Sequence, residues 1–206
     1  MILVKVGGGK TINWNFIAKD ISQLQKKDTI VIVHGASVKR DEIADKLGAP
    51  TKTVTSPSGI TSVYTDEKAL EIFLMVYSGL ANKQIVAVLQ KYGVNAVGLS
   101  GVDGKLWQAK AKKELLVKEG NKIKLIKDNK TGRVEKINTK LVSILLENGY
   151  IPVISAPAIS YENEIVNTDN DWAAAIMAGS LHVEKLVYLF EAPGLLKNHK
   201  DELSII

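Results

Sequence analysis

Short apolar runs alternate along this chain with segments whose apolar residues recur at helical spacing. Five runs have the length of buried strands, at residues 2–6, 29–34, 94–99, 150–155 and 185–190. The helical pattern covers residues 16–24, 66–79, 141–146 and 172–179. Strands that alternate with helices in this way predict an α/β fold, in which helices cover both faces of a mainly parallel sheet.

Two stretches depart from the alternation. Residues 106–134 contain short strands at 114–117 and 122–126, joined around Gly120, and this pattern predicts β-hairpins that project from the sheet. Residues 55–83 begin with a Pro/Gly loop and continue as a long helix that Thr65 or Asp66 would cap. The loop is either a simple connector or part of the lip of a binding site.

The loops that follow the predicted strands are rich in small residues. In sheets of this class, ligands bind beyond the carboxyl ends of the strands. The first of these loops is Gly7-Gly8-Gly9, whose backbone amides could approach a phosphate closely, although a plain tight turn has the same composition. The spacing matches neither the P-loop nor the dinucleotide-binding G-x-G-x-x-G motif. Lys5 on the preceding strand needs an anionic partner if it is buried, and otherwise marks a partly exposed strand.

The second strand ends in a similar loop, with the sequence "IVIVHGAS". Gly35, Ala36 and Ser37 offer small side chains and backbone amides to which an acid or a phosphate could bind. His34 could be read as a catalytic base, but a histidine that ends a β-strand is more often structural, and we favour the structural interpretation.

Polar residues crowd the start of the last predicted helix, in "EIVNTDNDWAAAIMAG". Asn and Asp at this place usually cap the helix, and carboxylates there suit the helix dipole. Capping accounts for about two of the four polar residues Asn167, Asp169, Asn170 and Asp171. Asn167 and Asp171 remain as candidates for contact with a ligand.

Composition restricts the class of protein. The 206 residues suffice for one large domain or a two-lobed unit, and 46% hydrophobic and 24% charged residues are ordinary for a soluble protein. The chain has no cysteine and three scattered histidines, which excludes disulfides and thiolate metal sites and disfavours a histidine metal site. No apolar run approaches the roughly 20 residues of a membrane span, and no signal peptide is evident. We expect a cytoplasmic protein with no membrane partner and no protein-built metal site.

The positive charge is concentrated in one window. The chain carries a net +5, yet residues 105–140 hold twelve Lys or Arg and four Asp or Glu, a net +8. Such a window is either a solvated face or a docking surface for an acidic partner. Nucleic acid is disfavoured as a partner, because the window lacks the interleaved aromatic residues that stack on bases.

Taken together, several motifs resemble the amino acid kinase superfamily, and within it the acetylglutamate-kinase-like branch. The motifs, in family order and spacing, are "KVGGGK", "IVHGAS", "TSPSGITSVYTDEKALEIF", "VNAVGLSGVDG", "LLENGYIPVISAPA" and "EIVNTDNDWAAA". The "HGAS" and "SPSG" forms look most like the kinases of lysine or arginine biosynthesis that phosphorylate 2-aminoadipate or glutamate held on an amino-group carrier protein. Acetylglutamate kinases usually have a second glycine where Ala36 stands.

The resemblance implies a fold, a reaction and a set of site residues. The fold would be a three-layer αβα sandwich with an open sheet, in which residues 1–166 form the amino-acid lobe and residues 167–206 begin an ATP lobe. The reaction would transfer a phosphoryl group from ATP, bound with Mg²⁺, to a side-chain carboxylate. Lys5 would stabilise the transferred group and Asp171 would orient Lys5. The residues implied for ATP and its phosphates are Gly7, Gly8, Gly9, Glu191 and Gly194, and those for the amino acid are Gly35, Ala36, Ser37, Val63 and Asn167.

The chain departs from the family pattern at three places. Family members generally carry an arginine where Val63 stands, and losing its bidentate grip on a carboxylate should cost on the order of 2–5 kcal/mol. Lys39 or Arg40 would then substitute, or the substrate differs, or the activity is weak. Glu191 stands where relatives tend to have Asn or Asp. The sequence ends after "YLFEAPGLL", before the family's second phosphate-binding lysine, so we expect an incomplete ATP lobe and impaired catalysis.

The leading hypothesis is therefore a carboxylate kinase that acts on a carrier-bound amino acid. The basic 105–140 region would bind the acidic carrier, and the 66–79 helix would form a homodimer, as the resemblance implies. One alternative is a kinase for free N-acetylglutamate, which the "HGAS" sequence and the basic window disfavour. The other is a degenerate, non-catalytic family member that binds an amino acid or a nucleotide.

Overall fold

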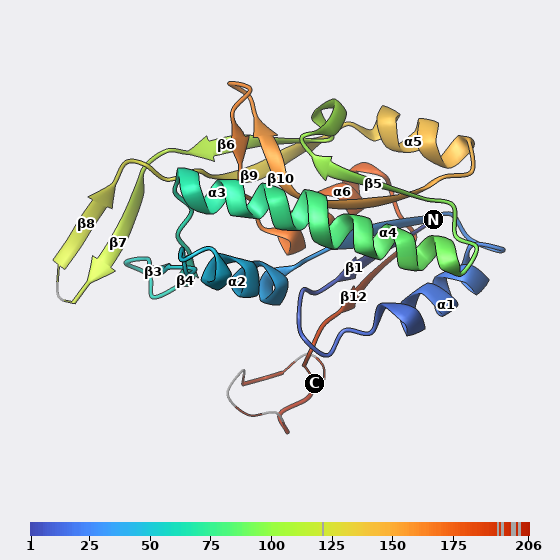
Figure 1. The fold of residues 1–206 in the computed structure, drawn as a ribbon, viewed down its shortest axis with the longest axis horizontal. Coiled ribbons are helices and arrows are strands. Elements are labelled where there is room, and N and C mark those ends of the chain that lie inside the picture. Colours follow the sequence, from blue (N-terminus) through green and yellow to red (C-terminus); the bar gives the residue numbers. More distant parts are fainter. Residues whose placement is uncertain (121, 193, 195, 199–200, 202) are drawn as a thin grey trace.

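A mixed β-sheet forms the centre of the molecule (Figure 1). The computed structural model describes residues 1–120, 122–192, 194, 196–198, 201 and 203–206. In this part of the chain, eight strands form one sheet in the order β12-β1-β2-β10-β6-β9, with β5 and β11 also paired to β10. Their bounds are β1 Ile2–Val6, β2 Ile30–His34, β5 Ala96–Gly101, β6 Trp107–Lys112, β9 Thr131–Ile137, β10 Ile151–Ser160, β11 Ile165–Val166 and β12 Lys185–Leu189.

The five apolar runs predicted from the sequence are the parallel part of this sheet. Strands β12, β1, β2, β10 and β5 pair in parallel, with Lys5 of β1 opposite Val33 of β2 and Tyr188 of β12. Strand β5 begins two residues later than the predicted run 94–99. Strand β10 continues five residues beyond the end of the predicted run 150–155. The extension pairs with β6 and β11, which the periodicity did not indicate.

Helices lie on both sides of the sheet, which confirms the αβα architecture (Figure 1). Helix α1 and the end of the long helix pack on one face, around Ile21, Ile85 and Val153, while α5 and α6 pack on the other, around Val142 and Met177. The helix bounds are α1 Trp14–Leu24, α2 Ser37–Lys46, α3 Glu67–Phe73, α4 Asn82–Lys91, α5 Thr139–Glu147 and α6 Asn170–Ser180. Helix α2 was not among the predicted helices, because its mostly charged sequence has little apolar periodicity.

The long helix is longer than the sequence pattern indicated. Asp66 caps α3, which continues through the π-helical segment η1, Leu74–Ala81, into α4 and ends at Lys91 instead of residue 79. By length and composition alone, this one helix among the described residues is apolar enough to cross a membrane. In the fold it is a core helix, because Val76, Ile85 and Leu89 are buried against the sheet.

Antiparallel hairpins project from one end of the sheet, as predicted (Figure 1). Strands β6 and β9 pair with each other and lead into a second pair, β7 Leu115–Glu119 and β8 Lys122–Ile126; these four strands form the hairpin arm. Asn121, in the predicted turn, lies outside the described residues. The Pro/Gly loop is itself the turn of a short hairpin formed by β3, Thr53–Thr55, and β4, Thr61–Val63.

Candidate functional site

Two βα turns pack against each other where β1 and β2 end. The Val38 amide and the Ser37 hydroxyl both donate hydrogen bonds to the Gly8 carbonyl, at 3.1 and 3.2 Å. A Cβ atom on Gly8 would lie 2.3 Å from the Ser37 nitrogen and 2.5 Å from the Ala36 nitrogen. Only glycine therefore fits at residue 8 without moving the start of α2.

The start of α2 differs from the other helix starts. Side-chain oxygens of Asn13, Asp66, Asn138 and Asp169 cap α1, α3, α5 and α6, respectively. No side chain of the described residues caps α2, whose N-cap residue is Ala36. The first-turn amides of a helix need acceptors, and together with the helix dipole they form a natural binding place for an anion. The glycine turn and the start of α2 can therefore cradle a phosphate or a carboxylate.

Lys5 and Asp171 form an ion pair beside these turns. The Lys5 side chain lies on the α6 side of β1, is only 10% exposed, and places its Nζ 2.5 Å from Asp171 Oδ1. The Asp171 side chain remains 62% exposed. Of the polar residues around it, Asp169 caps α6 and Asn170 accepts a hydrogen bond from the Ala156 amide. Hydrogen bonds to nearby backbone amides thus account for Asp169 and Asn170, and they leave Asn167 and Asp171 as the candidates for ligand contact.

Asn167 lies where three segments of the chain meet. Its Nδ2 donates to the Thr65 hydroxyl at 3.1 Å, its amide donates to the Lys130 carbonyl, and its carbonyl accepts from the Gly132 amide. Its side-chain oxygen is buried and, within the described residues, has no hydrogen-bond partner; the same is true of the Thr168 hydroxyl. A buried acceptor without a donor is costly, and a ligand N–H or O–H would satisfy it.

A cavity of about 290 Å³ lies on the other face of the sheet from Lys5, between the glycine turns and the helices α1 and α4. Five of the predicted residues line this glycine-turn cavity: Gly7, Gly8, Gly9, Gly35 and Ala36. Trp14, Ile85 and Val88 form its apolar wall. The turns therefore stand between this cavity and the Lys5–Asp171 pair, and the predicted residues do not all converge on one hollow.

The remaining predicted ATP residues lie beyond β12. Glu191 accepts hydrogen bonds from the amide and the hydroxyl of Thr11, and these bonds lower the pKa of its carboxyl group. Its carboxylate lies against Gly9, because a Cβ atom there would overlap it. Gly194 has a φ of +153° and packs beside Ile205. Pro193 and Leu195 of the same predicted loop lie outside the described residues.

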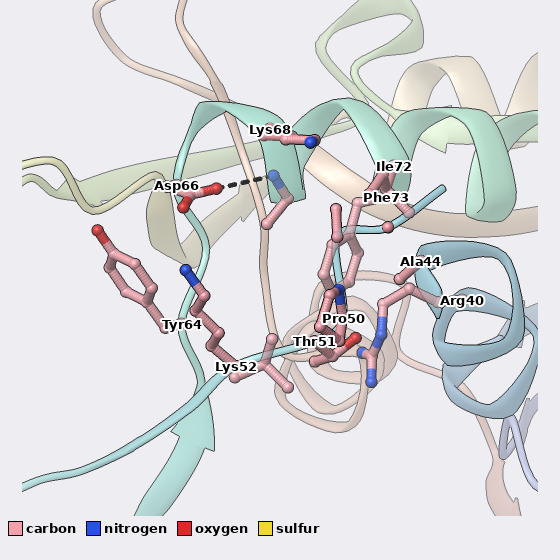
Figure 2. A pocket seen from close by; sticks show the side chains of 14 residues that line it. Arg40, Ala44, Pro50, Thr51, Lys52, Tyr64, Asp66, Lys68, Ile72 and Phe73 are labelled. Atoms are coloured by element: carbon pink, nitrogen blue, oxygen red, sulfur yellow. Dashed lines mark hydrogen bonds between the residues drawn. The ribbon is translucent and has the colours of Figure 1, made fainter. Parts of the chain in front are cut away.

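Val63 lines a second cavity, which lies on the face of α2 opposite the glycine-turn cavity. This α2–α3 cavity has a volume of about 180 Å³ and is bounded by α2, α3 and the β3–β4 hairpin (Figure 2). Arg40 lines it together with Val63, whereas Lys39 lines the glycine-turn cavity and is paired with Glu42 at 3.1 Å. Of the two cations considered as substitutes for the family arginine, only Arg40 shares a cavity with Val63.

His34 is structural, as the sequence analysis favoured. Its Nε2 accepts from the Nδ2 of Asn82 at 3.0 Å, since that amide nitrogen can only donate, and its Nδ1 therefore donates to the Gly35 carbonyl at 3.1 Å. Burial lowers the pKa of His34 to about 4, so the ring is neutral near pH 7. Asn82 also donates to the Val153 carbonyl and is fully buried in the long helix. The sequence analysis missed Asn82, although a polar residue on the apolar face of a helix was a usable signal.

Metal-binding groups are few in the part of the chain that the structure describes. Within it, no group of three His, Cys, Asp or Glu side chains is placed to hold a metal ion.

Comparison with known proteins links this geometry to kinases. The sequence profile of the amino acid kinase family matches residues 1–204. A LysW-aminoadipate kinase of Thermus thermophilus is 46% identical over 207 residues, which span 100% of this chain and 77% of that protein. An acetylglutamate kinase of Methanococcus maripaludis is 37% identical over 97% of this chain and 67% of its own length. The solved structure of smu.665 from Streptococcus mutans UA159 has the same fold, with a TM-score of 0.75 and 21% identity over 96% of this chain and 75% of that one.

Proposed function

Because the chain belongs to the amino acid kinase family, we propose that it transfers the γ-phosphoryl group of ATP to the side-chain carboxylate of an amino acid attached to a carrier protein. The amino acid is 2-aminoadipate or glutamate, the carrier is a LysW-type protein, the product is an acyl phosphate of lysine biosynthesis, and the enzyme is cytoplasmic. One observation carries the proposal: a buried ammonium, on Lys5, is neutralised by Asp171 next to two turns that can cradle anions. A site of this kind suits a reaction in which the anionic phosphates of ATP and an anionic carboxylate must be held close together.

The chemistry needs no activated protein nucleophile. A carboxylate oxygen of the substrate forms a bond to the γ-phosphorus while the bond from that phosphorus to the β,γ-bridging oxygen breaks, and the bridging electrons leave with ADP. Catalysis then consists of aligning the anions and neutralising their charge. In the proposal, Lys5 neutralises charge on the transferred group, and Asp171 keeps the ammonium in position. Mg²⁺ would arrive with the nucleotide and supply further positive charge between the phosphates.

We assign the other predicted residues to the nucleotide or to the amino acid. Gly7, Gly8 and Gly9 let the backbone approach the phosphates, and Glu191 and Gly194 belong to the nucleotide side. Gly35, Ala36, Ser37, Val63 and Asn167 belong to the amino-acid side. The Asn167 side-chain oxygen, which has no hydrogen-bond partner among the described residues, would accept the N–H of an amide-linked amino acid. In this assignment residues 1–166 form the amino-acid lobe, and the nucleotide lobe begins at residue 167.

An ADP-release assay tests the proposal with three acceptors. These are carrier-linked 2-aminoadipate, carrier-linked glutamate and free N-acetylglutamate, each at saturating ATP and Mg²⁺. We expect turnover with a carrier-linked acceptor and little with the free one. Preference for N-acetylglutamate would instead favour an acetylglutamate kinase. If all three acceptors bind without any ADP release, the chain is a non-catalytic binding protein of the family.

We propose that the hairpin arm is the docking surface for the carrier. Its outer strands expose Leu116, Ile123 and Leu125 beside lysines of the basic window, which suits an acidic partner. The base of the arm is fastened close to Asp171, since Trp172 Nε1 donates to the Val134 carbonyl at 2.9 Å. A carrier bound there would lie next to the proposed site.

Charge reversal separates docking from catalysis. In the variant Lys118→Glu/Lys122→Glu/Lys124→Glu, we expect the KM for the carrier-linked acceptor to rise about tenfold, with the effect shrinking at high salt. A matched control reverses Lys19, Lys46 and Lys91, which lie on the helices α1, α2 and α4, outside the hairpin arm. Equal losses with carrier-linked and free acceptors would remove the docking hypothesis.

We also propose a homodimer formed through the 66–79 helix. Met75 is 52% exposed on this helix, on a face that does not line the α2–α3 cavity. Light scattering of the variant Met75→Glu should show a shift from dimer to monomer, since a charge in an apolar interface is costly.

A further inference from the structure

We propose that Arg133 recognises the α-carboxylate of the acceptor amino acid and so determines acceptor specificity. The inference rests on the proposed function, because 2-aminoadipate or glutamate attached through its amino group keeps two carboxylates. One carboxylate receives the phosphoryl group, and the other is available to a guanidinium. Arg133 is exposed on β9, at the base of the hairpin arm, and within the described residues it forms no ion pair.

Trp172 holds the Arg133 side chain in place. The guanidinium carbon lies 3.8 Å from the centre of the Trp172 ring. The ring itself is fixed, because its Nε1 donates to the Val134 carbonyl at 2.9 Å, and Trp172 follows Asp171 in the first turn of α6. A guanidinium that stacks on an aromatic face keeps the N–H groups of its edge available. Arg133 is therefore arranged to bind a planar carboxylate through two parallel hydrogen bonds.

The strand register puts Arg133 and Asn167 on the same face. Thr131 and Asn167 are bridge partners in parallel segments, and the Gly132 amide donates to the Asn167 carbonyl at 2.8 Å. Paired residues of neighbouring strands point the same way, and so do residues two apart on one strand. Val134, which alternates with Arg133, is buried in the core. Arg133 therefore shares its face with the Asn167 side chain.

The chemistry of the acceptor requires such neighbours. In the proposed function, the Asn167 side-chain oxygen accepts the N–H through which the amino acid is linked to its carrier. The α-carbon bears both this nitrogen and the α-carboxylate, so the group that binds the carboxylate must lie close to the group that accepts from the N–H. Arg133 meets this condition. The side-chain carboxylate is then left to extend toward the Lys5–Asp171 pair, which Trp172 adjoins.

The carboxylates on neighbouring segments have other partners. Asp169 accepts from the first amides of α6, and Asp171 belongs to the buried ion pair. Glu135, which lies two residues from Arg133 on β9, interacts with the Tyr161 hydroxyl. The charge of Arg133 is thus left for a ligand. A role in carrier docking alone would make Arg133 insensitive to the amino acid attached, and this difference can be measured.

Two carrier-linked acceptors isolate the α-carboxylate. They are 2-aminoadipate and 5-aminopentanoate, which has the same chain and reacting carboxylate but lacks the α-carboxylate. Isothermal titration calorimetry of the full chain gives the Kd of each without turnover, and ADP release gives kcat and KM. We expect the wild type to bind linked 2-aminoadipate about tenfold more tightly.

Substitution of Arg133 should remove the preference. In the variant Arg133→Gln, we expect the two Kd values to agree within about twofold, because only linked 2-aminoadipate loses an interaction. The KM for this acceptor should rise while kcat at saturation stays within about threefold of the wild type. Arg133→Lys keeps the charge but loses the planar fork, so it should retain a preference of about threefold.

Lys136→Gln is the matched control, because it removes one positive charge from the same strand. It should weaken both acceptors equally and leave the tenfold preference intact. The proposal is overturned if the wild type binds both acceptors equally, if Arg133→Gln retains the full preference, or if neither acceptor binds. The preference without any ADP release would support Arg133 and overturn the kinase reaction. ADP release without the preference would do the reverse.

Discussion

The two cavities on either side of α2 are built in different ways. The glycine-turn cavity owes its shape to backbone atoms of two βα turns, where glycines allow strand ends and a helix start to touch. The α2–α3 cavity owes its character to side chains, brought together from α2, the β3–β4 hairpin and α3. Backbone cradles are recognisable from small residues that follow a strand. A side-chain cavity becomes visible only after the helices have packed.

The largest expected effect is a loss of kcat when Lys5, the cation of the buried ion pair, is replaced. Replacing Lys5 by methionine in the variant Lys5→Met should lower kcat about a thousandfold, or roughly 4 kcal/mol of transition-state stabilisation, because it removes the buried charge. Thermal unfolding should stay unchanged or rise, because Asp171 is exposed and remains solvated without its partner.

Two results would contradict this assignment of Lys5. One is a kcat within tenfold of the wild type. The other is a large loss of stability, which would mean that the ion pair has a structural purpose. Lys83→Met is the control. Like Lys5, Lys83 has polar partners, Asn82 and the Gly98 carbonyl, but it lines neither of the two cavities.

The second largest expected effect is a pH-dependent loss of about 3 kcal/mol in the free energy of unfolding, caused by His34 next to the glycine turns. Burial lowers the pKa of His34 from 6.5 to about 4, so the native state favours the neutral ring. Above pH 6.5 its contribution to the free energy of unfolding is fully present. It is lost as the pH falls from 6.5 to 4, because the unfolded chain binds the proton first, and below pH 4 this group causes no further loss. Urea unfolding at several pH values should show this decrease.

The variant His34→Gln isolates the histidine contribution, because glutamine cannot titrate but can still accept from Asn82. Its free energy of unfolding should be flatter between pH 6.5 and 4 than that of the wild type. Parallel curves for the two proteins would mean that other groups cause the acid sensitivity.

The sequence predicted features that depend on local patterns better than features that depend on the packing of distant side chains. The central strands, the helix starts and the pairing of a buried Lys5 with an acid were accessible, because each rests on local periodicity or on the cost of burying a charge. Helix α2 was missed because its core-facing residues include Arg40, which carries no apolar signal. Of the cations that share a cavity with Val63, Arg40 was named from the sequence together with Lys39, whereas Lys52 and Lys68 were not, because they line the cavity only once the β3–β4 segment and α3 lie beside α2.

Gly8→Ala tests the backbone character of the first cavity. The new Cβ atom would meet the Ser37 nitrogen at 2.3 Å, so α2 must move, and we expect kcat/KM to fall about thirtyfold, or roughly 2 kcal/mol. Gly79→Ala is the matched control. A Cβ there has only the Leu74 carbonyl oxygen near it, at 3.9 Å, and alanine should stabilise the helix by about 0.5–1 kcal/mol. Equal activity of the two variants would argue against a cradle formed by the backbone.

The smallest expected effect comes from filling the second cavity. Ala69 lies on α3 and lines the α2–α3 cavity, where a larger apolar side chain has room. Ala69→Leu should raise the free energy of unfolding by about 0.5–1 kcal/mol, because it buries apolar surface in an existing hollow. We expect kcat at saturating substrate to stay within twofold of the wild type. Urea unfolding and ADP release measure the two quantities. If the substitution abolished turnover, the two faces of α2 would belong to one site, and the contrast between them would fail.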